Sequence, residues 1–324
     1  MKISITDVEN GRFSGYLRDH WTELGHEVVL QGGYNPEKAD WADLIWIDWT
    51  DLNVQLAASQ EWFDKTPHER FSRPIIDRDK KKLINRMIDI DMWSGHGAGV
   101  KWEGVDDLVF VAPHIQRLAN QRFASAGIRD VSQHLIRLGV DLDKWNFRDR
   151  RTDKVKNIAF VGELWENKGI DRALRILIQL VRQSDTNWRL HLKGRWPNAN
   201  YFYHYNQNLI DSNGVRELIT FYEDFIPDMN DWYSQMDYIL VPSIKEAFSY
   251  VTAECMSKGI KPVINRFYGA PEIWPEKYIF DTESEAVKML LSSEYNPEEY
   301  RYYIAEHYDI KRMFSEVDKI CELS

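Results

Sequence analysis

The stretch "DYILVPSIKEAFSYVTAECMSKGIKPVINRF", residues 237–267, carries the pattern that decides the fold. Its apolar run at 237–243 predicts a strand, and a second apolar run at 261–267 predicts another. Between them, residues 250–258 predict a helix that ends at Gly259. Two strands joined by one helix form a βαβ unit, whose strands are parallel. The stretch therefore predicts an open parallel sheet covered by helices.

The same alternation extends over the rest of the chain. In the first half, strands are expected at residues 2–6, 27–30, 42–49, 73–79 and 106–113, and helices at 16–24 and 53–63. In the second half, further strands are expected at 157–162, 188–194 and 218–224, with a short helix at 229–236. A helix is also expected after the first of these strands, because apolar residues recur at the three- and four-residue intervals of one buried helix face: Ile170, Ala173, Leu174, Leu177, Leu180 and Val181. The sequence thus predicts two similar α/β domains in tandem.

The length of the chain also favours two domains, because 324 residues exceed the size at which one hydrophobic core usually stops growing. The periodic pattern lapses into charged residues over 142–156, which is typical of a linker. We expect a first domain at residues 1–147, a second at 148–302, and a closing amphipathic helix at about 303–324.

Composition narrows the functional classes. The formal net charge of -10 argues against strong non-specific binding to nucleic acid or anionic lipid. No apolar run reaches the roughly 20 residues of a membrane span, and the first residues lack the pattern of a secretory leader. The two cysteines, Cys255 and Cys321, are too few for a disulfide framework and have no metal-ligand spacing. These features predict a cytoplasmic protein without a transmembrane segment.

Two carboxylates, Glu246 and Glu254, flank the start of the predicted helix at 250–258. Ligands of parallel sheets bind beyond the carboxyl ends of the strands, and Glu246 follows such an end. Backbone N–H groups at a helix start favour phosphate or hydroxyl oxygens. Here those groups are expected from Ala247, Phe248, Ser249 and Tyr250. Glu254 would lie near the second turn and face the same cleft. Taken without the rest of the sequence, the two glutamates could instead be exposed residues on a solvated helix, without a functional role.

The segment "VPSIKEAFSYVTAECMSKGIKPVINRFYGAPEIW" (241–274) resembles the signature of retaining GT-B glycosyltransferases of the family 4 type (GT4), the glycosyl transferases group 1. In that family a Glu-x7-Glu motif follows a Pro-Ser strand end and precedes a Gly-x-Pro-Val strand. "FVGELWENKGID" (160–171) is similar to the family's Gly-Arg-Leu and Lys-Gly loop, and "HLIRLGVDLDKWNF" (134–147) to its Asn-Gly-Val-Asp segment. The resemblance covers about residues 131–280. It implies two Rossmann-like domains whose parallel sheets face each other across a cleft, with the closing helix crossing back to the first domain.

The resemblance also implies a reaction and roles for individual residues. Glu246 would contact hydroxyls of the transferred sugar, and Glu254 would hold the ribose of the nucleotide. Eight residues of helix rise about 12 Å, comparable to the distance from a hexose to a ribose across a diphosphate. Lys168, which shares a loop with Gly162, matches the lysine that meets the leaving diphosphate. The implied enzyme transfers a hexose-like sugar from a nucleotide-diphosphate sugar to an acceptor hydroxyl, with retention of configuration and without a metal or a cofactor.

One position departs from the family pattern. Glu163 occupies the position where the family has an arginine, and a carboxylate beside two phosphates would repel them. Lys193 and Arg195, just after "WRLHL" (188–192), are candidates to supply the missing positive charge. Ordinary surface cations are the alternative interpretation of these two residues.

The acceptor is expected on the first domain, where the candidates are scattered. Ser14 and Gly15 open a helix, Asp79 ends a predicted strand, and His96 lies in a glycine-rich loop. A saccharide, a lipid-linked molecule and a small molecule all remain open as the acceptor. The sequence contains no recognisable nucleophile–base pair and no cluster of metal ligands.

Three other functions are weighed against this one. A non-catalytic carbohydrate- or nucleotide-binding relative would have lost donor chemistry together with the arginine. A glycosyltransferase that modifies DNA is disfavoured, but not excluded, by the acidic balance. An NAD-dependent oxidoreductase is disfavoured because no G-x-G-x-x-G follows the first predicted strand.

Overall fold

The computed structural model describes residues 1–59, 81–88, 91, 96–128, 131–147 and 155–323. Contacts between residues divide the chain into two compact units. Unit 1 comprises Met1–Leu138 and Lys311–Ser324, and unit 2 comprises Gly139–Ile310. The sequence placed the boundaries at 147/148 and 302/303, whereas the structure assigns residues 139–147 and 303–310 to unit 2.

Unit 1 is built on a six-stranded sheet in the order β2-β1-β3-β4-β5-β6. Its strands are β1 (Lys2–Thr6), β2 (Glu27–Gln31), β3 (Leu44–Asp48), β4 (Lys82–Met87), β5 (Asp107–Phe110) and β6 (Ser132–Leu135). Neighbouring strands pair in parallel. The chain passes from β1 to β2 on one side and then crosses to β3 on the other side of β1. The strand order therefore reverses between β1 and β3, where open α/β sheets have their ligand crevice.

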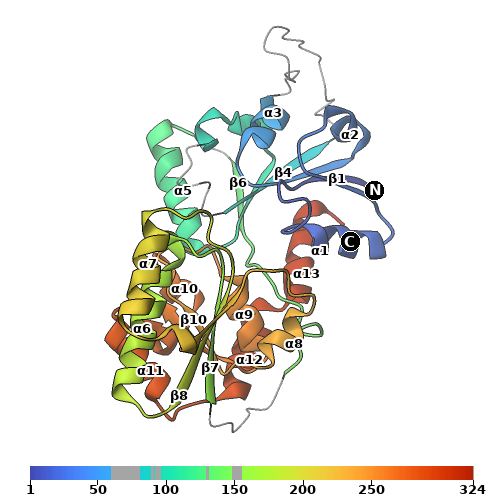
Figure 1. Cartoon of the computed structure of the whole chain (residues 1–324). Coiled ribbons are helices and arrows are strands. Elements are labelled where there is room, and N and C mark those ends of the chain that lie inside the picture. The colour runs from blue at the N-terminus through green and yellow to red at the C-terminus, as the bar shows by residue number, and fades with distance from the viewer. Residues whose placement is uncertain (60–80, 89–90, 92–95, 129–130, 148–154, 324) are drawn as a thin grey trace. The chain divides into compact units, whose positions relative to one another are not determined.

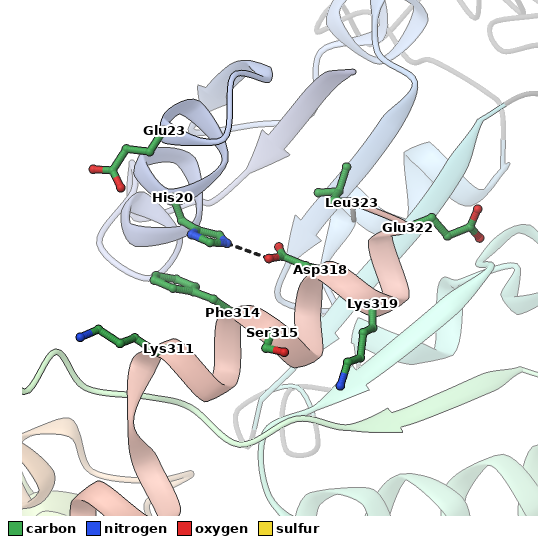
Figure 2. A pocket seen from close by; sticks show the side chains of 9 residues that line it. All are labelled: His20, Glu23, Lys311, Phe314, Ser315, Asp318, Lys319, Glu322 and Leu323. Atoms are coloured by element: carbon green, nitrogen blue, oxygen red, sulfur yellow. Dashed lines mark hydrogen bonds and ion pairs between the residues drawn. The ribbon is translucent and has the colours of Figure 1, made fainter.

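The described helices of unit 1 are α1 (Gly15–Glu23), α2 (Pro36–Trp41), α3 (Leu52–Ser59), α5 (Pro113–Ala126) and α13 (Ile310–Cys321), with short 3-10 helices η2 (His96–Gly99) and η3 (Trp102–Gly104). Figure 1 shows α13 beside α1, although they are almost 300 residues apart in sequence. The imidazole of His20 lies 2.9 Å from a carboxylate oxygen of Asp318 and stacks on the ring of Phe314 at 4.0 Å (Figure 2). Trp21 Nε1 donates to the other oxygen of Asp318 at 2.9 Å. These contacts fix α13 to unit 1.

A groove of about 880 Å³ lies between α1 and α13, lined by His20, Glu23 and Phe314 among others (Figure 2). Helix α1 begins after the carboxyl end of β1 and ends before the amino end of β2. The groove borders the last turns of α1. It therefore lies away from the sheet edge where ligand-binding loops gather.

Unit 2 has a second six-stranded parallel sheet, in the order β12-β11-β10-β7-β8-β9. Its strands are β7 (Val155–Val161), β8 (Asn187–Lys193), β9 (Ile219–Tyr222), β10 (Tyr238–Val241), β11 (Lys261–Asn265) and β12 (Ile279–Phe280). Counted from the first strand of the unit, this is the 3-2-1-4-5-6 order of the Rossmann fold. The order reverses between β7 and β10.

Helices cover both faces of this sheet (Figure 1). One face carries α6 (Ile170–Gln183), α7 (Tyr201–Ser212) and α11 (Glu283–Leu291), and the other carries α9 (Tyr250–Ser257) and α12 (Pro297–Tyr308). Shorter elements are η4 (Glu166–Lys168), η5 (Arg216–Leu218), α8 (Met229–Tyr233), α10 (Ala270–Ile273) and η6 (Glu276–Tyr278). The predicted apolar face of α6 is confirmed, because Leu174, Leu177 and Leu180 are at most 1% exposed. Each such leucine contributes about 2 kcal/mol of hydrophobic stabilisation.

The predicted fold class, α/β with two Rossmann-like domains, is confirmed by the two parallel sheets. Strands β4 and β6 were not predicted from the sequence. The sequence of β4, "KLINRM", has polar Asn85 and Arg86 at positions that are buried, so it does not read as an apolar strand. The strand predicted at 73–79 lies outside the described residues.

Candidate functional site

A lysine and a glutamate meet where the strand order of unit 2 reverses. Lys168 ends η4, in the loop after β7, and Glu246 lies in the loop between β10 and α9. Lys168 Nζ donates a 2.7 Å hydrogen bond to Glu246 Oε1 and forms an ion pair with it. The side chains are 31% and 14% exposed, so the pair remains accessible from solvent. The structure thus brings together two predicted site residues that are 78 positions apart.

A main-chain contact holds the two loops together. The N–H of Ile244 donates to the carbonyl of Asn167 at 3.0 Å. Gly169 has a φ of +72°, and a Cβ at this position would lie 2.3 Å from the carbonyl oxygen of Pro242. Only glycine combines a left-handed backbone with so close an approach. The position of Lys168 therefore depends on the absence of a side chain at its neighbour.

The start of α9 offers hydrogen-bond donors beside this pair. Among the described residues, none accepts a hydrogen bond from the backbone N–H of Ala247, Phe248 or Ser249. Tyr250 is the first residue of α9. The dipole of the helix adds partial positive charge at the same place. An oxyanion would find both donors and a favourable potential here.

Two features fix the conformation of this helix start. Ser249 adopts a φ of +75°, which costs a non-glycine residue about 1–2 kcal/mol, and its hydroxyl lies 2.8 Å from that of Thr252. Phe248 is only 3% exposed and packs against the rings of Trp274 and Tyr308, with centroids at 5.4 and 4.8 Å. The buried ring anchors the loop while the surrounding main chain stays at the sheet edge.

Glu254 lies in the second turn of α9, where it is half-buried beside Tyr233. Burial raises the pKa of the Glu254 carboxyl to about 7, although a hydrogen bond from Tyr233 and the charge of Lys144 act in the opposite direction. The hydroxyl of Tyr233 donates to Glu254 Oε2 at 3.1 Å. At neutral pH this carboxyl therefore changes its charge readily, and a ligand that donates hydrogen bonds to it favours the ionised form.

The loops after β7 and β8 are joined through their main chains. Gly162 N–H donates to the carbonyl of Lys193, and Leu164 N–H to that of Arg195, both at 2.9 Å. Gly162 and Gly194 lie close together, since a Cβ on Gly194 would come 1.8 Å from the carbonyl oxygen of Gly162. The predicted site residues Gly162, Lys193 and Arg195 are therefore neighbours through the backbone.

The side chains of Lys193 and Arg195, in contrast, bind the loop after β9. Lys193 Nζ donates to the carbonyl of Asp224 at 2.9 Å, and Arg195 Nε to that of Glu223 at 2.8 Å. In the described part of unit 2, neither cation is hydrogen-bonded to or ion-paired with Lys168 or Glu246. Glu163 is exposed.

The candidates in unit 1 fall into different environments. Ser14 is fully buried, its N–H donates to Asp7 Oδ2 at 2.9 Å, and its hydroxyl accepts from Arg86 at 3.4 Å. Gly15 begins α1, and a Cβ on it would meet no other atom within 4 Å. His96 begins η2, and Asp79 lies outside the described residues. The hydroxyl of Ser14 thus belongs to the scaffold, whereas Gly15 leaves open space beside the first helix.

Unit 1 contains a buried ion pair that was not predicted from the sequence. Arg86 in β4 and Asp48 at the end of β3 are paired through Nε and Oδ1 at 2.6 Å, and their side chains are 4% and 2% exposed. Two charges on neighbouring strands leave no local pattern in the sequence, so only the sheet pairing reveals them.

Within the described ranges, no group of three or more histidine, cysteine, aspartate or glutamate side chains is placed to hold a metal ion. The helices in the same part of the chain include none that is both long and apolar enough to cross a membrane.

Most of unit 2 is similar to a known protein family. Residues 155–304 match the model of the family described as glycosyl transferases group 1. An uncharacterized glycosyltransferase of Methanocaldococcus jannaschii is 29% identical over 134 residues, which are 40% of this chain. The match spans 33% of that relative, about a third of its length.

Solved structures resemble the whole chain. The sucrose-phosphate synthase of Thermosynechococcus elongatus aligns with a TM-score of 0.74 at 11% identity, covering 99% of this chain and 98% of that one. HepE of Anabaena, solved in complex with UDP-glucose, aligns with a TM-score of 0.66 at 14% identity, covering 99% of each chain. At such identities the likeness concerns the fold, and it confirms the predicted GT-B fold.

Replacement of Gly169 by alanine should destabilise unit 2 strongly. A left-handed alanine costs about 1 kcal/mol, and the clash with the carbonyl of Pro242 adds about 1–3 kcal/mol. Gly214→Ala is the matched control, because Gly214 also has a positive φ of +64° but open space around its Cβ position. Urea unfolding followed by circular dichroism measures both losses. Equal losses in the two variants would show that the contact with Pro242 is unimportant.

The raised pKa of Glu254 predicts a pH-dependent stability. Well below pH 4.5 the carboxyl is protonated in both the folded and the unfolded chain, so it does not change the free energy of unfolding there. Between pH 4.5 and about 7 the unfolded chain ionises first, which lowers the free energy of unfolding by up to about 3 kcal/mol, and the loss persists at higher pH. Glu254→Gln should therefore be about as stable as wild type at about pH 3.5 and more stable than wild type at about pH 8. The exposed Glu217→Gln variant serves as control, and a Glu254→Gln difference that is the same at both pH values would contradict the assignment.

Proposed function

We propose that the chain transfers a sugar from a nucleotide-diphosphate sugar to an acceptor hydroxyl, because residues 155–304 match the model of the glycosyl transferases group 1 family. The observation that carries the proposal is the contact between Lys168 and Glu246 beside the start of α9. It combines a cation, a carboxylate and free backbone donors at the ligand-binding edge of a Rossmann sheet. A diphosphate is bound by the cation and the backbone N–H donors, and the hydroxyls of a sugar are bound by the carboxylate.

Lys168 and the N–H groups of Ala247, Phe248 and Ser249 bind the diphosphate in this proposal. A diphosphate carries more negative charge than one carboxylate, so it displaces Glu246 as the partner of Lys168. The released carboxylate then accepts hydrogen bonds from hydroxyls of the transferred sugar. The ion pair of the free protein thus becomes two separate contacts, one to phosphate and one to sugar.

Glu254 binds the ribose hydroxyls. Two hydroxyl donors stabilise the ionised carboxylate and lower its pKa from about 7. Binding of a nucleotide near neutral pH therefore releases a fraction of a proton.

The reaction exchanges one bond at the anomeric carbon. The bond to the phosphate oxygen breaks, and a bond to the acceptor oxygen forms on the same face, so the configuration is retained. The proton of the acceptor hydroxyl passes to the departing phosphate oxygen. Lys168 and the helix start stabilise the charge that develops on that phosphate, and the mechanism asks for no metal or cofactor. The chain works as a hexosyltransferase, in the cytoplasm, by this proposal.

The first donors to test are uridine nucleotides, because HepE was solved with UDP and with UDP-glucose. Incubation of the protein with UDP-sugars and GDP-sugars, followed by detection of released nucleoside diphosphate, tests the activity. A second candidate function is a binding protein that has lost catalysis, and the exposed Glu163 at the position of the family's arginine favours it. Nucleotide binding without any transfer or hydrolysis would decide for that candidate.

Neutralising Lys168 should weaken nucleotide binding, whereas neutralising Glu246 should lower sugar transfer. Lys168→Met removes a charge-assisted hydrogen bond to phosphate, worth about 1.5–3 kcal/mol, so UDP binding should weaken by about 10- to 150-fold while uridine binding stays unchanged. Glu246→Gln frees Lys168, so UDP should bind at least as tightly as in wild type, while sugar transfer falls at least about tenfold. Calorimetry with UDP and uridine, together with a transfer assay, measures these effects. An equal loss of UDP and uridine binding in Lys168→Met would show that the lysine is structural.

Substitution of Glu254 should have the opposite selectivity. Because the ribose is common to uridine and UDP, Glu254→Ala should weaken both by about 1–3 kcal/mol. The same calorimetric titrations give both values. Unchanged affinity for both ligands would remove Glu254 from the nucleotide site.

A further inference from the structure

Two aromatic side chains lie at the carboxyl ends of β1 and β3, where the strand order of unit 1 reverses. Phe13 is in the loop after β1, and Trp49 directly follows β3. Their ring centroids are 5.7 Å apart and their planes meet at 65°. Both side chains are half-buried. The pair therefore occupies the place where the topology of this sheet favours a ligand.

The backbone of Trp49 is held in an unfavourable conformation. Its φ of +75° is a genuine outlier for so bulky a residue. The N–H of Trp49 donates to the carbonyl of Arg86 at 3.0 Å, and its carbonyl accepts from Asn85 Nδ2 at 2.8 Å. Asn85 and Thr50 are fully buried and hydrogen-bonded to each other at 2.8 Å. Strain that is fixed from several sides is characteristic of functional sites.

A buried charge network positions Phe13. The guanidinium of Arg86 is paired with Asp48 and also donates to the carbonyl of Phe13 at 2.8 Å. The carboxylate of Asp7 accepts from the N–H of Phe13 at 3.0 Å and from that of Ser14 at 2.9 Å. Arg86 therefore fixes the loop after β1 against β3 and β4, and Asp7, the first residue of this loop, holds its two ends together.

A packing role alone does not require this arrangement. Two other tryptophans of unit 1, Trp21 and Trp46, fill its interior, with 0% exposure and ring centroids 5.8 Å apart. Trp49 is instead partly exposed, at a backbone geometry that costs stability. A partly exposed tryptophan that is held rigid has the properties of a binding surface.

We propose that Trp49, supported by Phe13, is a platform on which the apolar face of an acceptor sugar ring packs. A pyranose combines C–H groups on its faces with hydroxyls around its rim, so it matches an aromatic surface edged by polar groups. The exposed Arg12 and Glu9 pair at 3.8 Å, and the Arg12 guanidinium lies 5.7 Å from the ring centroid of Phe13. Such a charged rim suits hydroxyls and does not suit a lipid chain. The description of the bound sugar as an acceptor rests on the proposed function, and it makes the acceptor a saccharide.

The test uses the full chain and a set of methyl pyranosides, namely the α and β anomers of methyl glucoside, galactoside, mannoside and N-acetylglucosaminide. Saturation-transfer NMR gives the affinity of each. Trp49→Asn removes the ring, and asparagine tolerates the left-handed backbone better than most residues, so this variant should fold. Trp49→Tyr keeps an aromatic face. Trp41→Ala is the matched control, because Trp41 is also a half-buried tryptophan of unit 1 but ends α2, which precedes the amino end of β3.

At least one pyranoside should bind wild type and Trp41→Ala equally, lose at least tenfold in affinity in Trp49→Asn, and recover to within about threefold in Trp49→Tyr. Absence of binding to wild type would overturn the proposal, as would an unchanged affinity in Trp49→Asn or an equal loss in Trp49→Tyr. Calorimetry with UDP is run on the same proteins and should give the same affinity throughout. Failure of wild type to bind UDP would count against the proposed function alone, since the pyranoside comparison does not depend on the donor.

Discussion

The close approach of Gly169 to the carbonyl of Pro242 is the constraint on which the site in unit 2 depends. It allows the loops after β7 and β10 to pack main chain against main chain, with the hydrogen bond from Ile244 to Asn167 beside it. The same glycine is the residue from which α6 starts, so one position sets both the entry of the chain into the core and the location of Lys168. Because main-chain atoms make these contacts, the relative position of the two loops does not depend on side-chain rotamers.

The electrostatics of this edge are balanced in the free protein. Lys168 is neutralised by Glu246, and Glu254 is kept near its titration point by burial rather than by a partner cation. In the proposed function, an anionic ligand replaces Glu246 as the partner of Lys168 instead of meeting an isolated charge. The ion pair lowers the free-energy cost of a half-buried lysine in the free protein, because an unpaired charge in the same place would lose hydration without a compensating partner.

Much of this arrangement could be predicted from the sequence, because local patterns identify strands, helix ends and motif positions. It located Lys168 and Glu246 separately, yet their contact joins positions 78 residues apart and follows only from the strand order. The direction in which Lys193 and Arg195 point was not predictable, since it depends on the loop after β9. In unit 1, β4 was missed because Asn85 and Arg86 are polar, and the left-handed backbone of Trp49 contradicts the preferences of its residue type. Local rules fail at these positions because tertiary contacts override them.

The return of α13 to unit 1 has a consequence for how the protein is made. Met313, Val317 and Cys321 are at most 3% exposed, and Lys82 Nζ donates to the carbonyl of Ile320 at 2.5 Å. These residues leave the ribosome only after all of unit 2, whereas unit 2 is one continuous piece of chain. Domains generally fold as units during synthesis. Unit 2 can therefore be complete while unit 1, although synthesised first, still exposes the apolar surface that its last helix will cover, so the nascent N-terminal segment is the part most in need of a chaperone.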